Sequence, residues 1–449
     1  MMQSEQVPVL RRQWPLPSKE ERAAVGSQAA AQELTGIGKL AFGSLWLLTF
    51  AIPWEDAITI SGFGTSARLI GVVTVVLGLI AILERGTLKR PMPGHFMMAL
   101  FVISAGVSYL WSLYPEGTLI QMVTYIQLFA LVWLIWELCP GIREQKLLMQ
   151  AYVLGTFVSG THTIYRFFAH QESAYQRYAG SGLDANDLGL MMALSIPVSY
   201  YLLIQAKGRM AWVYRLQIIL AVTTVLLTAS RGATLACLVA LVIVPLTHTR
   251  LTTRKKIALL LTLSLLVSGV LVLVPASSWE RLSTVPNEVE HGTLTGRTVI
   301  WKAGWQIFRE HPFLGIGSNA FRLIVSRVLE EPIRLDDPDS PAPPAHNTFL
   351  SVLVEQGVIG FAIFCIMLSV LGFSLMTMPP FPQKLWIVVL AVWAVGVSSL
   401  TWEMRKPTWF FFGLLIAQCG SMVQKRVATH GDACGLVEPG VSALHLSWS

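Results

Sequence analysis

The chain has 449 residues, of which 53% are hydrophobic and only 13% are charged, and its formal net charge is +7. Ordinary globular domains carry about 25% charged residues, so the composition excludes a soluble enzyme and indicates an integral membrane protein. The positive charge does not indicate nucleic-acid binding, because the topology of a membrane protein decides where its basic residues lie.

Apolar segments of about 20 residues, the length that crosses a bilayer, recur along the chain and predict an all-α polytopic membrane protein. The polar residues 1–37 are expected to form a cytoplasmic tail. Nine transmembrane helices are predicted within 38–275 and three within 347–423, in chain order 38–54, 67–84, 94–112, 118–138, 145–168, 185–205, 211–229, 232–248, 256–275, 347–377, 383–402 and 407–423. A large periplasmic loop at 276–346 and a cytoplasmic tail at 424–449 complete the chain.

The basic residues predict the orientation, because Lys and Arg are enriched in short cytoplasmic loops. With the N-terminus inside, 20 of the 33 Lys and Arg residues lie in cytoplasmic segments, and only six lie in the short outer loops. Both termini are therefore expected in the cytoplasm, and the loop at 276–346 is expected outside.

The large loop contains two predicted helices. GTLTGRTVIWKAGWQIFREHP has an apolar face with Val299, Ile300, Ala303 and Ile307, so it is expected to form an amphipathic helix. A second short helix is expected in NAFRLIVSRVLEE, with Ser318 as its N-cap. We call these two helices the roof, because they would cover the outer end of the bundle.

His346 is the candidate for acid–base chemistry, since an imidazole with a pKa near 6.5 exchanges protons at neutral pH. It stands in PAPPAHNTFL, where a proline-rich stretch meets an apolar run. The alternative is a polar residue that merely starts a helix. The next residue, Asn347, can cap that helix or bind a ligand, and capping is its commoner role.

Three outer arginines are candidates for binding an anion: Arg177, Arg231 and Arg297. An arginine near the membrane is costly unless it is paired, and such residues tend to be functional. The alternative for each is an interaction with lipid headgroups. Their occurrence on the same side as His346 favours a shared anionic ligand.

Asp336, Asp337 and Asp339 contain the D-x-D pattern that metal-dependent sugar transferases use to hold a divalent ion. The pattern lies in a proline-rich stretch without supporting ligands. We therefore predict no metal and no cofactor, and expect the arginines to neutralise any phosphate charge.

Three motifs carry a family resemblance: HNTFLSVLVEQGVIG, which begins at His346, REHPFLGIGSNAF upstream of it, and RYAGSGLDANDLG around Arg177. A large outer loop before the histidine supports them, and the resemblance covers roughly residues 170–400. The chain resembles the O-antigen ligases, the lipopolysaccharide core–O-antigen ligase family, within the superfamily that includes O-antigen polymerases and bacterial O-linked oligosaccharyltransferases.

The resemblance implies an enzyme of the Gram-negative inner membrane that acts on the periplasmic side. Its donor would be a polysaccharide on undecaprenyl pyrophosphate, and its acceptor a sugar hydroxyl of lipid A–core, with membrane lipids around it and no nucleic acid. The transfer would be metal-independent and inverting. His346 would activate or position the acceptor hydroxyl, Arg177, Arg231 and Arg297 would bind the pyrophosphate, and Asn347 would support the residues that touch substrate.

Other functions stay open at this point. An O-antigen polymerase would use the same donor, but its R-x10-G pattern is absent at the three arginines, whereas His346 has Gly357 eleven positions later. A protein-glycosylating transferase usually has a longer C-terminal periplasmic region. A transporter of the same lipid would carry ionisable residues in the middle of its helices, where this chain has few.

Overall fold

The structure, a computed structural model, describes residues 34, 36–60, 64–170, 177–247, 252, 254, 257, 297–329 and 344–435. Its elements in chain order are α2 (Gly36–Ala51), η1 (Ile52–Ala57), β1 (Thr59–Ile60), β2 (Gly64–Thr65), α3 (Ser66–Arg85), α4 (Pro93–Val107), η2 (Ser108–Trp111), α5 (Pro115–Leu138), α6 (Ile142–Phe168), α7 (Ala185–Gln205), α8 (Arg209–Leu227), α9 (Arg231–Thr247), α13 (Arg297–Glu310), α14 (Phe321–Val328), α15 (Thr348–Ser374), η3 (Leu375–Thr377), α16 (Pro380–Val397) and α17 (Lys406–Gly435). β1 and β2 form a small antiparallel hairpin.

Helices occupy most of each predicted transmembrane segment within the described residues, but the span predicted at 383–402 ends too late, because α16 ends at Val397. Eight of them are long and apolar enough to cross a membrane: α2 with η1, α3, α4 with η2, α5, α7, α8, α15 with η3, and α16. The prediction of an all-α membrane protein is confirmed, and the count of twelve spans and the periplasmic loop stay predictions. The ninth predicted span, at 256–275, lies outside the described residues except for residue 257, as does most of the two predicted tails. α17 continues as a helix to Gly435, beyond the predicted end of its span.

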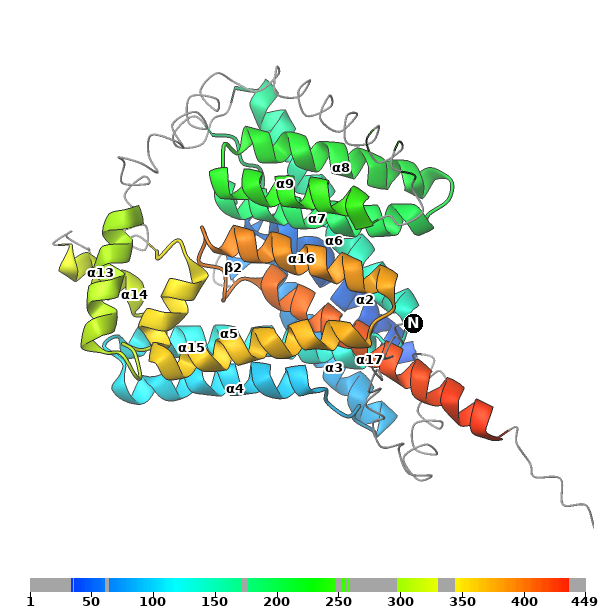
Figure 1. Ribbon diagram of the computed structural model, residues 1–449, viewed down its shortest axis with the longest axis horizontal. Helices are drawn as coiled ribbons and strands as arrows, with labels where there is room; N and C mark the ends of the chain where they lie inside the picture. The colour runs from blue at the N-terminus through cyan, green and yellow to red at the C-terminus, as the bar shows by residue number, and fades with distance from the viewer. Residues whose placement is uncertain are drawn as a thin grey trace, which may run out of the picture.

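The long helices run side by side in a bundle, in which α7, α8 and α9 lie on one side and α4, α5 and α15 on the other (Figure 1). α7 is the most enclosed of the candidate spans, with 83% of its apolar window buried, against 22% for α3. On α3, Leu69, Val72, Val73 and Val76 are exposed. A helix that is apolar on every side suits a lipid environment, so α3 is expected to face the bilayer.

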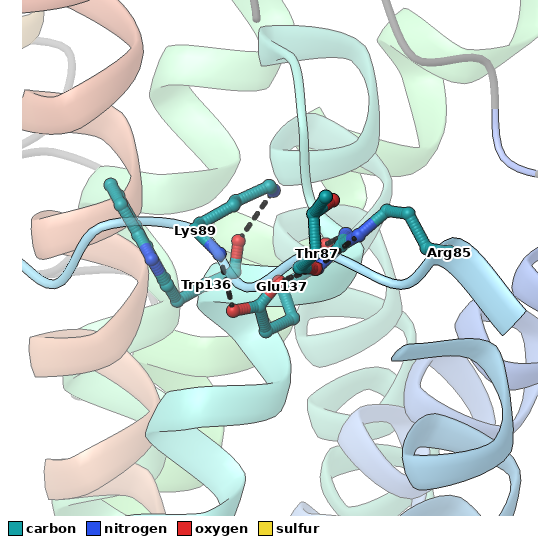
Figure 2. Close-up of polar contacts among 5 residues, drawn as sticks. All are labelled: Arg85, Thr87, Lys89, Trp136 and Glu137. Atoms are coloured by element: carbon teal, nitrogen blue, oxygen red, sulfur yellow. Dashed lines mark hydrogen bonds and ion pairs between the residues drawn. The ribbon is translucent and has the colours of Figure 1, made fainter. Parts of the chain in front are cut away.

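At one end of the bundle, a buried carboxylate joins α3 and α5. Glu137, near the end of α5, is fully buried and forms an ion pair with Arg85 at the end of α3. The Lys89 backbone N–H donates to Glu137 Oε1 at 3.0 Å, and Lys89 Nζ donates to the Trp136 carbonyl at 2.7 Å (Figure 2). A buried charge is tolerated when it is paired and hydrogen-bonded, so this cluster fixes the α3–α4 connection onto α5.

The two roof helices, α13 and α14, stand at the opposite end of α5 and pack against α15 (Figure 1). The predicted amphipathic helix is present: Ile300, Ala303 and Ile307 are buried against α14 and α15, whereas Val299 is exposed. Thr118, in the first turn of α5, donates to the Ser318 carbonyl at 2.8 Å and joins the roof to the bundle.

α15 is interrupted at Gly357, whose φ of +63° and ψ of −170° are not helical. The loop after α13 enters this interruption and supplies the hydrogen bonds that the helix loses there. Four backbone hydrogen bonds join the two stretches: Ile316 N–H to Val354 O (3.2 Å), Gly317 N–H to Glu355 O (2.9 Å), Val358 N–H to Pro312 O (2.8 Å) and Ile359 N–H to Phe313 O (3.3 Å). We call residues 312–317 and 354–359 the interleaved segments.

The interleaved segments approach so closely that glycine is required on each side. A Cβ on Gly357 would clash with the Phe313 carbonyl, and a Cβ on Gly315 would clash with the Glu355 carbonyl. Both glycines also have positive φ angles, which side chains disfavour. The motifs HPFLGIG and VEQGVIG are therefore two halves of one structural unit.

The prediction that Ser318 caps the second roof helix is wrong. α14 begins at Phe321, and no side chain of its own N-cap residue, Ala320, accepts a hydrogen bond there. Instead, the Phe321 N–H donates to Glu355 Oε1 of α15 at 3.2 Å. The Ser318 N–H is bonded to Ser108 Oγ at 3.1 Å. A distant carboxylate thus takes the place of the expected local cap.

Candidate functional site

His346 lies immediately before α15, at the roof end of the bundle, and its backbone is strained. Its φ is +47°, a left-handed conformation that few residues other than glycine adopt. Such outliers persist only where the surroundings hold them and are often found at functional sites. The Ala345 carbonyl, next to His346, accepts a hydrogen bond from Trp301 Nε1 at 2.9 Å.

Asn347 is the N-cap of α15. Its side-chain oxygen accepts a hydrogen bond from the Leu350 N–H at 3.0 Å, as expected of an asparagine that satisfies a free amide in the first helical turn. Capping is the role that the structure shows for Asn347, and it fixes the backbone on the C-terminal side of His346.

The imidazole of His346 is placed among cationic groups. Burial, and after it the charges of Arg297 and Arg322, lower its pKa from 6.5 to about 4, against the opposing charge of Asp184. A neutral imidazole is therefore present at pH 7 and can accept a proton. The three charged neighbours come from α13, α14 and the N-cap of α7.

Arg297 and Arg231 are close to each other. Arg297 begins α13 and Arg231 begins α9. The pKa of Arg297 is lowered chiefly by burial and then by the charge of Arg231, with Asp184 acting in the opposite direction. Like charges brought together are unfavourable unless an anion joins them. Of the predicted residues, the structure thus places Arg297 near both Arg231 and His346.

Arg177 is connected to this group through α7. Its Nε donates to the Thr228 carbonyl and its Nη2 donates to Asn186 Oδ1, both at 2.8 Å. The Asn186 amide in turn donates to Asp184 Oδ1 at 2.9 Å. Arg177 therefore fixes the carboxylate of Asp184, which acts on both His346 and Arg297.

Two residues of this group were not selected from the sequence. Asp184 belongs to the same RYAGSGLDANDLG motif as Arg177, and Arg322 directly follows GIGSNAF. Both side chains are exposed. Asp184 lies inside a recognised motif and Arg322 directly after one, which was a usable signal, but nothing in the local pattern distinguished Arg322 from the other arginines of the loop.

The loop after α16 holds the starts of α7 and α15 together. Trp402 Nε1 donates to Asp187 Oδ1 at 2.8 Å, and Arg405 forms an ion pair with the same carboxylate. The Trp402 backbone N–H donates to Thr348 Oγ1 at 2.8 Å. Because Asp187 is in the first turn of α7 and Thr348 begins α15, this loop fixes the relative positions of Asp184 and His346.

Among the described residues, no group of three or more His, Cys, Asp or Glu side chains is placed to hold a metal ion. Asp336, Asp337 and Asp339, the D-x-D candidates, lie outside the described residues.

The comparison with known protein families agrees with the motifs. Residues 216–365 match the family model described as O-antigen ligase. The matched stretch includes Arg231, Arg297, Arg322 and His346, whereas Arg177 precedes it. No curated protein matches the chain. Residues 216–365 are thus similar to the O-antigen ligase family, which confirms the resemblance predicted from the sequence.

Proposed function

We propose that the protein transfers O-antigen polysaccharide from undecaprenyl pyrophosphate to a sugar hydroxyl of lipid A–core, by an inverting reaction that needs no metal. The family match indicates a glycosyl-transferring enzyme of the ligase or polymerase type. The observation that carries the proposal is a histidine kept neutral beside the guanidinium groups of Arg297 and Arg322. This combination supports a proton acceptor beside a binding site for an anionic leaving group.

The diphosphate of the donor fits the arginines. Guanidinium groups bind phosphate through paired N–H donors as well as charge. Arg231 and Arg297 are assigned to direct contact, and Arg322 is added to the predicted set because it shares their surroundings. Arg177 is bonded to the Thr228 carbonyl and to Asn186 of α7, and we assign its charge to the diphosphate as well.

The proposed reaction has one displacement step. The acceptor hydroxyl oxygen attacks the anomeric carbon while its proton passes to the His346 imidazole. The bond from the anomeric carbon to the diphosphate oxygen breaks, and undecaprenyl pyrophosphate leaves with the electron pair. Preorganised positive charge stabilises the leaving group. The bound diphosphate also offsets the arginines that disfavour the imidazolium, so donor binding makes His346 a stronger base.

The pH dependence of transfer is expected to follow His346. kcat/KM reports the groups of the free enzyme, in which the pKa of His346 is about 4. Protonated imidazole cannot accept the hydroxyl proton, so kcat/KM is expected to fall only as the pH approaches 4. In R297Q, which removes one neighbouring cation, the fall is expected at higher pH. A wild-type profile that falls around the ordinary histidine pKa would contradict this assignment.

Arg297→Gln is expected to raise the KM for the lipid-linked donor by about 10- to 100-fold. A hydrogen bond to a charged group contributes about 1.5–3 kcal/mol, and glutamine removes that charge. The measurement is initial transfer rate against donor concentration in mixed micelles. R309Q is the matched control, because Arg309 lies in the last turn of the same helix and is exposed. Equal KM values for the two variants would remove Arg297 from the donor site.

Reconstitution tests the function itself. The purified protein is mixed with a prenyl pyrophosphate-linked glycan and lipid A–core, with a metal chelator present. Glycan attached to lipid A–core supports the proposal. Glycan that lengthens on the prenyl carrier without lipid A–core would identify a polymerase instead. Movement of the intact lipid-linked glycan between leaflets, with no new glycosidic bond, would identify a transporter.

We also propose that the site faces the periplasm, in an inner-membrane protein with both termini in the cytoplasm. Two features support this orientation. The candidate site residues gather at one end of the bundle, and Arg85 and Lys89, which the charge rule places in the cytoplasm, lie at the other end of α5. Reporter fusions at the α3–α4 loop and in the roof would show on which side of the membrane each of them lies.

A further inference from the structure

Trp301 links the two halves of the proposed site. It lies four residues after Arg297 on α13, and residues four apart share one face of a helix. Its indole Nε1 donates to the Ala345 carbonyl at 2.9 Å. Ala345 is fully buried, and its peptide bond leads directly into His346. The helix that carries Arg297 thus holds the backbone of the histidine.

This contact acts at a strained position. His346 has a φ of +47°, and on its C-terminal side the Asn347 cap fixes the chain to α15. On its N-terminal side, the Trp301 hydrogen bond fixes the chain to α13. A left-handed histidine between two such anchors has little freedom to move its ring relative to either helix.

We propose that Trp301 is a positioning residue, which sets the separation between the His346 imidazole and the Arg297 guanidinium. The inference rests on the proposed function, because it assigns Trp301 to the transfer reaction. The charged groups that act on His346 are Arg297 on α13, Arg322 on α14 and Asp184 at the start of α7. Among these charges, that of Arg297 has the largest effect on His346. Trp301 holds the Arg297 guanidinium at its distance from the ring.

The kinetic test compares two phenylalanine variants of α13. Trp301→Phe keeps an aromatic ring and removes the N–H donor. Its kcat is expected to fall by about 10- to 100-fold, the loss that a small misplacement of a reacting group causes, with the donor KM changed much less. W305F is the matched control, because Trp305 is 51% exposed and its ring contacts Phe308 in a tilted arrangement. A W301F enzyme as fast as W305F would overturn the inference.

A second measurement needs no activity and so separates this inference from the proposed function. The pKa of His346 is read from the NMR spectrum of 13C-histidine-labelled protein, with the His346 signal assigned by its absence in H346N. In W301F the pKa is expected to rise toward 6.5, because Arg297 no longer stays beside the ring. In the R297Q background, W301F is expected to cause little further rise. An unchanged pKa in W301F, or the same rise with and without Arg297, would overturn the positioning role.

If W301F does not fold, the same titration is made on W301L, which also lacks the donor. Wild-type protein that gives no ligation would refute the proposed function whatever the NMR result. Wild-type ligation with equal His346 titration in W301F and W305F would refute the role of Trp301 alone.

Discussion

Replacing His346 with asparagine is expected to lower kcat for glycan transfer by about 100-fold or more. Acid–base catalysis by a positioned side chain contributes roughly 10²- to 10⁴-fold. Asparagine tolerates the left-handed backbone of this position, so H346N removes the titratable ring without adding strain at a φ of +47°. The measurement is kcat for transfer to lipid A–core at saturating donor.

Two further variants make this result specific. H346A should lose as much activity, with some added strain in the backbone. H311N is the control, since His311 directly follows α13 and its side chain is exposed. Transfer by H346N at the wild-type rate would remove His346 from the chemistry and leave it as a residue at the start of a helix.

Gly357→Ala is expected to destabilise the protein by about 3 kcal/mol. A φ of +63° with a ψ of −170° belongs to a region that essentially only glycine occupies, and a residue forced into it costs about 1–3 kcal/mol. The added methyl group would also clash with the Phe313 carbonyl and disturb the hydrogen bonds of the interleaved segments. The melting temperature in detergent should fall by roughly 5 °C or more.

A second glycine of α15 provides the control. Gly372 lies in the later part of the helix, and a Cβ added there meets no atom within 4 Å. Alanine in a helix interior is favoured over glycine by about 1 kcal/mol, so G372A should leave the melting temperature unchanged or raise it. G315A should resemble G357A, because it clashes with Glu355 from the other interleaved segment. Similar melting temperatures for G357A and G372A would show that the interruption at Gly357 is not needed.

The helices of the bundle could be predicted from the sequence because a bilayer imposes a simple rule on length and hydropathy. α7 illustrates this, since the predicted span at 185–205 has the bounds of the observed helix. The amphipathic helix α13 could also be predicted, because its apolar residues recur at helical spacing.

The interruption in α15 and the cap of α14 could not be predicted, because both depend on contacts between residues far apart in the chain. Gly357 stands in an apolar run that reads as one continuous span. The partner of its neighbour Val358 is the Pro312 carbonyl, which lies in another loop. Likewise, the Phe321 N–H is bonded to Glu355, and the nearby Ser318 was the natural local candidate.

The candidate site was predicted in part. Arg231, Arg297 and His346 stand out by residue type, and the fold brings them together from α9, α13 and the start of α15. Arg322 and Asp184 were missed as site residues, because their importance lies in their position beside the histidine. Asn347 was expected to cap or to support the site, and its hydrogen bond to Leu350 shows the cap.

The interleaved segments also limit how this protein can be recombined with a relative. Each of their four hydrogen bonds joins a residue of 312–317 to a residue of 354–359. A one-residue insertion in either stretch would shift the register of these bonds, and a crossover between the two would pair segments of different parents. Working chimeras should therefore inherit the roof and the first half of α15 from the same parent. The roof can then be transplanted only as a block that includes His346.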